Sequence, residues 1–125
     1  MEHAQGRWKP FNLQQKLQVF LAGLRTAVQS DRNVAIQMAL SLVVLIAAFG
    51  LRAWFDFVLI LIVTGHILVV EMINTAIEAI CDYIQPEHDA RIGAIKDVAA
   101  AASGVAILMW IAVMLYEVVR IWTML

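Results

Sequence analysis

The sequence predicts an all-α integral membrane protein, built from one amphipathic surface helix followed by three membrane-spanning helices. Composition indicates the class, because 62% of the 125 residues are hydrophobic and the mean hydropathy is +0.80, well above the averages of soluble proteins. The distribution of charge indicates the helices, because the charged residues, 15% of the chain, gather in short segments between long apolar runs. A chain of this length is expected to form one domain, residues 1–125.

The N-terminal part of the chain predicts a helix lying on the membrane surface. Residues 1–10 are mostly polar and are expected to be solvent-exposed. Between about residues 11 and 29, apolar side chains recur at three- and four-residue steps, while Arg25 and several glutamines occupy other faces. The recurring residues are Leu13, Leu17, Leu21, Leu24 and Val28. This spacing is typical of an amphipathic surface helix, and packing of the helix on its own bundle is equally compatible with it.

Three long apolar stretches follow, at about residues 34–51, 54–84 and 96–122. Each is long enough to cross the hydrocarbon core of a bilayer, which takes about 20 helical residues. Residues 30–33 offer N-cap side chains for the first stretch, and Pro86 ends the second. Residues 85–95 are expected to form a polar loop before the third stretch.

The basic residues predict the orientation of the chain in the membrane. Seven of them lie before the first stretch or between the second and third: Arg7, Lys9, Lys16, Arg25, Arg32, Arg91 and Lys96. The opposite side has only Arg52 and Arg120. Because cytosolic segments carry the excess of positive charge, the N-terminus, the surface helix and the loop at 85–95 are expected to be cytosolic.

One face of the second membrane helix is polar. At about 100° per residue, four polar side chains of this segment fall within one narrow arc. These residues, which we call the acidic row, are Glu71, Asn74, Glu78 and Asp82. A lone carboxylate in hydrocarbon costs about 2.5–3.5 kcal/mol even on the lenient insertion scale. The acidic row must therefore face protein, a metal ion or a wet cavity, and a functional site is the default interpretation.

The polar side chains at the cytosolic face favour magnesium and phosphate chemistry. Besides the acidic row, they are Asp31, Glu87, Lys96 and Asp97. Carboxylates with an amide, in the absence of a Cys/His cluster, favour Mg²⁺ over Zn²⁺, and Mg²⁺ usually brings phosphates with it. A lysine at the start of a helix could hold phosphate through its charge and the free amides. Together with the membrane location, these features indicate phosphoryl transfer to a lipid.

Other kinds of site find no support in the sequence. It contains neither GxxxxGK[ST] nor GxGxxG, so an ordinary nucleotide-binding fold is excluded. It has no Ser/His/Asp set at a credible position for acyl transfer and no basic patch with interleaved aromatic residues for a nucleic acid. Cys81 is expected to be a small packing residue rather than a redox group. His66 is expected to be a packed or hydrogen-bonded histidine rather than a ligand.

The acidic row and several other segments closely resemble the signature of the small bacterial diacylglycerol kinase/undecaprenol kinase family. The matching segments are Glu71-Met-Ile-Asn-Thr-Ala-Ile-Glu-Ala-Ile-Cys-Asp82, Lys96-Asp97-Val-Ala-Ala, Gly23-Leu24-Arg25 and Ser30-Asp31-Arg32-Asn33. The resemblance covers nearly the whole chain from about residue 11. It implies a homotrimer of three-span subunits in the bacterial inner membrane, with composite active sites between neighbours. It also implies direct transfer of the γ-phosphate from MgATP to a lipid hydroxyl.

The same resemblance implies roles for individual residues, which we carry over by motif. Glu71 would be the general base, and Asn74 would help to position it or the lipid hydroxyl. Asp31 and Glu78 would hold the Mg²⁺ ion, and Lys96 would touch the β- and γ-phosphates. The remaining candidates are Asp97, Glu87, His88 and Asp89 near the nucleoside, and Arg25 and Ala100 beside Glu71 on the lipid side.

Two departures from the family pattern bear on these roles. The family usually has glutamate where this chain has Asp31, so the metal carboxylate is one methylene shorter. It also usually has Glu-Tyr-His where this chain has Glu87-His88-Asp89, so the contacts to the nucleoside are expected to differ.

The sequence alone does not decide which lipid is the acceptor, and it leaves two alternatives to a lipid kinase. Residues 30–33, 74–76 and 96–100 look more like the undecaprenol kinase branch, so undecaprenol is favoured over diacylglycerol, whose phosphorylation gives phosphatidic acid. Both lipids present a primary hydroxyl beside long apolar chains, and apolar grooves discriminate poorly between such chains. Alternatively, the acidic row could be polar glue between helices of an oligomer, or Glu71 could couple protons in a small transporter. A transporter would place this charge near the bilayer midplane, whereas Glu71 is expected towards the cytosolic end of its helix.

Overall fold

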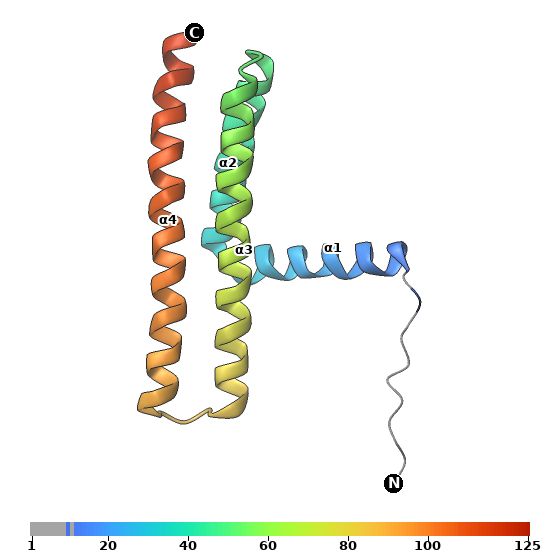
Figure 1. The fold of residues 1–125 in the computed structure, drawn as a ribbon, viewed down its shortest axis with the longest axis vertical. Coiled ribbons are helices and arrows are strands. Elements are labelled where there is room, and N and C mark those ends of the chain that lie inside the picture. The colour runs from blue at the N-terminus through green and yellow to red at the C-terminus, as the bar shows by residue number, and fades with distance from the viewer. Residues whose placement is uncertain (1–9, 11) are drawn as a thin grey trace.

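The computed structural model describes residue 10 and residues 12–125. In order along the chain, its helices are α1 (Leu13–Ser30), α2 (Arg32–Gly50), α3 (Trp54–Ile84) and α4 (Ala90–Met124). Helices α2, α3 and α4 run alongside one another, and α1 projects sideways from this bundle (Figure 1). By length and composition, α2, α3 and α4 are each able to cross a membrane. The all-α class and the three apolar membrane helices are therefore confirmed. Of the expected polar N-terminal segment, all but the exposed Pro10 lies outside the described residues.

Helix α1 stands apart from the bundle, with almost all of its side chains exposed. Its amide end is capped by Asn12, whose side chain accepts a hydrogen bond from the Gln15 amide. Ala27 is its one buried residue. A Cβ added at Gly23 would meet the Met72 side chain at 3.7 Å, so α1 passes close to α3 at that level. Most of the apolar face of α1 is thus not covered by the chain's own bundle.

Asp31 sets the junction between α1 and α2. It is the C-cap of α1 and the N-cap of α2, and its side chain accepts a hydrogen bond from the Asn33 amide at 2.7 Å. Because this cap satisfies an amide of the first turn, α2 begins at Arg32 rather than near residue 34. The two helices change direction at a single residue, which turns α1 away from the bundle.

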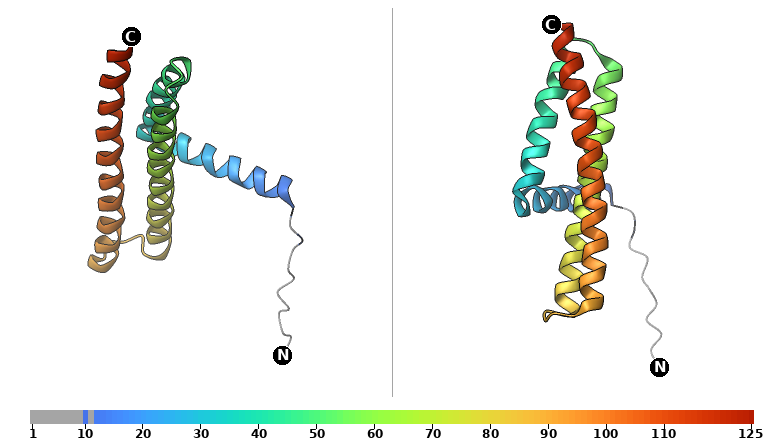
Figure 2. Two further views of the ribbon diagram at one scale, coloured as in Figure 1. Left: turned by 45° about the horizontal axis from the view of Figure 1, so that its top comes forward. Right: turned by 90° about the vertical axis from the view of Figure 1, so that its left-hand side faces the viewer.

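Helices α3 and α4 are longer than a bilayer requires. The 31 residues of α3 span about 46 Å at 1.5 Å per residue, whereas the hydrocarbon core is about 30 Å thick. Both helices continue past the level of α1 to the loop that joins them (Figure 1 and the right-hand view of Figure 2). Since α1 passes α3 beside Met72, most of the acidic row lies on this extension.

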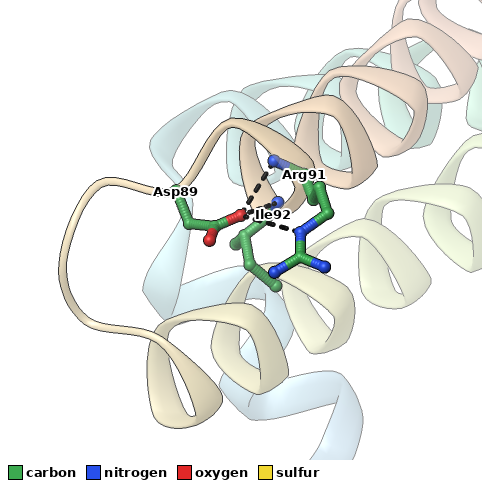
Figure 3. Close-up of polar contacts among 3 residues, drawn as sticks. All are labelled: Asp89, Arg91 and Ile92. Carbon is green, nitrogen blue, oxygen red and sulfur yellow. Dashed lines mark hydrogen bonds and ion pairs between the residues drawn. The ribbon is translucent and has the colours of Figure 1, made fainter.

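Helix α4 begins earlier than the sequence predicted. Asp89 caps it by accepting hydrogen bonds from the amides of Arg91 at 2.8 Å and Ile92 at 3.2 Å (Figure 3). The polar connection is therefore confined to residues 85–89, and residues 90–95, expected to be loop, are helical. The prediction that Lys96 lies at the start of its helix is wrong, because the Asp89 cap places it further along α4. Its phosphate contacts would have to come from the side chain alone.

Apolar packing and several polar contacts hold the three long helices together. Ile60, Val63 and Ile67 of α3 belong to the same buried cluster as Ala106 and Trp110 of α4. The Trp110 indole N–H donates a hydrogen bond to the buried hydroxyl of Ser41, which joins α4 to α2 at 2.9 Å. At the far end, the Arg120 guanidinium pairs with the buried Asp56 carboxylate at 2.5 Å. Glu117 lies beside Asp56 and is 0% exposed.

The structure confirms the predicted environment of Cys81 but not that of His66. Cys81 is buried, as expected of a packing residue. His66 was expected to be packed or hydrogen-bonded, but it is exposed on the outside of α3 in the single chain. The helix period explains this position. Residue 66 does not fall on the side of α3 that faces α2 and α4, so its side chain lies on the outer surface.

Candidate active site

Glu71 is the buried end of the acidic row. Its side chain points from α3 towards α4, and the residue is 6% exposed. Its Oε1 atom accepts a hydrogen bond from the Ser103 hydroxyl at 2.8 Å. This bond links two residues 32 positions apart in the sequence, so the register between α3 and α4 decides where the carboxylate lies. A buried carboxylate that is held by one hydrogen bond is suited to accept a proton from a substrate hydroxyl.

Asn74 and Glu78 continue the row by one helical turn each. The Asn74 amide nitrogen donates a hydrogen bond to Glu78 Oε1 at 3.2 Å. Within the described part of the chain, the Asn74 Oδ1 atom is buried and has no hydrogen-bond partner. Glu78 is exposed. The amide therefore orients the Glu78 carboxylate while its oxygen is free to accept a hydrogen bond from a bound molecule.

Lys96 and Asp82 close the row at the loop end. The Lys96 ammonium lies 2.6 Å from Asp82 Oδ1, and the two side chains are 37% and 66% exposed. Glu78 is also close enough to attract Lys96. This lysine therefore brings one positive charge to the end of the row, where it remains accessible to a ligand from solution.

The acidic row lies between two surface hollows of different character. One is an apolar groove of about 190 Å³ between α3 and α4, lined by Val70, Ile73, Asn74, Ile77, Ala99 and Ala102. The other is a more polar hollow of about 290 Å³ at the connecting loop. It is lined by Asp82, Gln85, Pro86, Glu87, His88, Asp89, Ile92, Gly93 and Lys96. The row thus connects a place suited to an alkyl chain with a place suited to a polar ligand.

The structure does not gather all the predicted site residues around one point. Among the described residues, no three His, Cys, Asp or Glu side chains come together as a metal site. Asp31 is at the α1–α2 junction, where it caps α2. Arg25, Asp97 and Ala100 are exposed on their helices, and the roles expected for them stay predictions.

Two features of the polar structure were missed from the sequence. Ser103 was not singled out from the sequence, although it is the only hydroxyl residue in the small-residue run of residues 99–104. The burial of Asp56 and Glu117, which are 2% and 0% exposed, was not predicted either. The available signal was the same in both cases, namely a polar residue on the buried stripe of an otherwise apolar helix.

Comparison with known proteins identifies the family of the chain. The family model for prokaryotic diacylglycerol kinase matches residues 18–118, a range that includes the whole acidic row and Lys96. Neither the curated proteins nor the solved structures gave a match. Enzymes of this family are lipid kinases, so the transporter alternative is not supported. The chain belongs to the prokaryotic diacylglycerol kinase family and is a lipid kinase that crosses the membrane several times.

Proposed function

We propose that the protein transfers the γ-phosphate of MgATP directly to the primary hydroxyl of a membrane lipid alcohol, at the cytosolic edge of the bacterial inner membrane. ATP as donor and a lipid as acceptor follow from the family. The observation that carries the rest is the position of Glu71. It is a buried carboxylate at the level where α1 meets α3, with the apolar groove and the loop hollow on either side of its row.

The apolar groove is the proposed place for the lipid chain. Ile73 and Ile77 of α3 and Ala99 and Ala102 of α4 offer a surface that alkyl groups can cover. A lipid bound there presents its hydroxyl to the α3–α4 interface, where Glu71 accepts the proton as the hydroxyl attacks phosphorus. Arg25 and Ala100 belong to the same lipid side in this proposal. Phosphoryl transfer depends mainly on positioning and charge stabilisation, so a carboxylate is a sufficient base.

The loop hollow is the proposed place for the nucleotide. Lys96 lines this hollow and is paired with Asp82. When the nucleotide binds, the Lys96 ammonium would pair in part with the β- and γ-phosphates instead, because they carry more negative charge than one carboxylate. Glu87, His88 and Asp89 line the same hollow and would contact the nucleoside, with Asp97 nearby. The triphosphate would then run along α3 towards Glu71. In this arrangement the γ-phosphate and the lipid hydroxyl would meet beside the acidic row.

The residues of the row fit a magnesium ion. Their donors are carboxylate and amide oxygens, the ligands that Mg²⁺ prefers, and Mg²⁺ is commonly held by one or two carboxylates plus substrate phosphates. Glu78 would be one protein ligand, because its carboxylate is exposed and oriented by Asn74. Asp31 would be the second, with the oxygen that does not cap α2. The ion would neutralise charge that develops on the transferred phosphoryl group.

The proposal also includes a homotrimer and a preference for undecaprenol. The resemblance of the sequence supports both. A trimer would let residues of neighbouring subunits complete a site that one chain leaves open, including the Asp31 ligand. The undecaprenol preference rests on residues 30–33, 74–76 and 96–100; diacylglycerol is the alternative acceptor.

Glu71→Gln tests the proposed base. We expect kcat to fall by about 10²- to 10⁴-fold, the range typical of general acid–base catalysis, while the protein stays folded. Glu117→Gln is the matched control, because it makes the same change at a buried carboxylate near the other end of the bundle. Lipid phosphorylation per mole of purified protein, with the unfolding temperature measured alongside, checks both variants. Near-normal turnover by Glu71→Gln would remove the base from the proposal.

A further inference from the structure

We propose that Ser103 is a positioning residue for the reaction, which fixes the carboxylate of Glu71 without touching either substrate. This inference rests on the proposed function of Glu71. Ser103 is 7% exposed, and its hydroxyl donates to Glu71 Oε1 at 2.8 Å across the α3–α4 interface. Within the described residues, this is the one hydrogen bond recorded for the Glu71 side chain.

The hydroxyl of Ser103 is committed to Glu71 rather than to its own helix. A serine or threonine inside a helix commonly donates to the carbonyl of the preceding turn. The chain shows that arrangement at Thr26, which donates to the Ala22 carbonyl at 2.9 Å, and at Ser30, which donates to the Thr26 carbonyl. The Ser103 hydroxyl instead crosses to α3. Its proton therefore serves the carboxylate and not the local backbone.

Packing alone does not require a hydroxyl at this position. The buried stripe of α4 that faces α3 includes Ala99, Ser103, Ala106 and Trp110. Alanine fills the neighbouring positions of this stripe, so the α3–α4 interface accepts small apolar side chains there. What the hydroxyl adds is a donor aimed at Glu71. The donor occupies Oε1, which leaves Oε2 as the atom that can receive a proton from the lipid hydroxyl.

Ser103 acts through Glu71 and not through substrate binding. The groove proposed for the lipid is lined by Ala99 and Ala102 of α4, and the loop hollow by Lys96 and residues before it. Ser103 lines neither. Its loss should therefore let the Glu71 side chain take several rotamers, which lowers the fraction in reactive geometry and leaves ground-state binding unchanged. A misplacement of about 1 Å costs up to about 10²-fold in rate.

Three variants in membranes or lipid vesicles test the inference. Ser103→Ala should lower kcat about 10- to 100-fold while the KM values for ATP and for the lipid stay within about twofold. Ser103→Thr keeps the hydroxyl and should restore most of kcat. Ser41→Ala is the matched control, because Ser41 is also buried and also links two helices, through Trp110, but does not contact the acidic row; its kcat per folded protein should match the wild type.

The outcomes separate this inference from the proposed function. If Ser103→Ala keeps the wild-type kcat while Glu71→Gln has lost activity, the positioning role is wrong and the base assignment stands. If Glu71→Gln keeps wild-type activity, the base assignment itself is wrong. A rise in KM with unchanged kcat would show that Ser103 acts in binding, and an equal loss in Ser41→Ala would show a general packing effect. Either result overturns the inference. Should Ser103→Ala fold poorly, an inactive but well-folded Ser103→Thr would overturn it equally.

Discussion

At the scale of single residues, Lys96 shows how an exposed ion pair can serve function more than stability. Its partner Asp82 comes from 14 residues earlier in the chain, so the pair joins the last turns of α3 to the second turn of α4. Both side chains are substantially exposed, and exposed pairs contribute little to the free energy of unfolding. The pair therefore holds the lysine at the mouth of the loop hollow without anchoring the fold.

Lys96→Met tests this assignment. Methionine keeps most of the length of the side chain and removes the charge, so we expect KM for ATP to rise by at least tenfold, because a charge-assisted contact is worth about 1.5–3 kcal/mol. The unfolding temperature should hardly change. Initial rates against ATP concentration measure the effect. Arg91→Met is the control, since Arg91 is exposed on the same helix but does not line the loop hollow. An unchanged KM in Lys96→Met would contradict the phosphate role.

The sequence predicts which residues share one side of a helix, but it does not predict which residues of two different helices are in contact. The acidic row follows from the helix period alone, because residues 71, 74, 78 and 82 share one side of any continuous α-helix. The partner of Glu71 does not follow in this way. Ser103 meets Glu71 only because α3 and α4 have one particular rotation and register, which depends on the packing of every side chain between them.

At the scale of helices, the start of α4 depends on one cap. Asp89 accepts two amide hydrogen bonds of the first turn and also lies 3.8 Å from the Arg91 guanidinium. Asp89→Ala should therefore weaken this turn by about 1 kcal/mol, as other N-cap losses do. Amide hydrogen exchange should quicken about fivefold at residues 90–93, with Glu87→Ala as the control. Unchanged exchange in Asp89→Ala would show that the cap does not hold the turn.

The same element shows where prediction from the sequence fell short. Pro86 correctly ended α3, but the polar residues after it were taken as loop up to residue 95. Aspartate directly before a helical segment is an N-cap signal, and Asp89 satisfies the free amides of Arg91 and Ile92. The hydropathy pattern weakened the signal, because the first turns of α4 lie beyond the apolar part of the helix and carry Arg91, Lys96 and Asp97.

At the scale of the whole molecule, three apolar helices and one sideways helix form an arrangement in which the proposed site would lie at a membrane edge. Hydropathy alone predicts the three spans, because burying apolar surface in a bilayer requires helices of that length. The extension of α3 and α4 past the level of α1 follows from the unbroken periodicity of α3 to Ile84. The assembly does not follow from one chain. The exposed His66 in the apolar part of α3 and the position of Asp31 at the α1–α2 junction are the two features that the proposed homotrimer would have to account for.

The most direct measurement of the central claim is phosphate transfer in sealed vesicles of known orientation. The vesicles would contain the purified protein with equal amounts of undecaprenol and diacylglycerol, and γ-labelled MgATP would be supplied to one face at a time. We predict labelled lipid only when MgATP reaches the face that carries α1 and the α3–α4 loop, with undecaprenyl phosphate as the main product. The absence of labelled lipid from either face, or labelling only from the opposite face, would contradict the account.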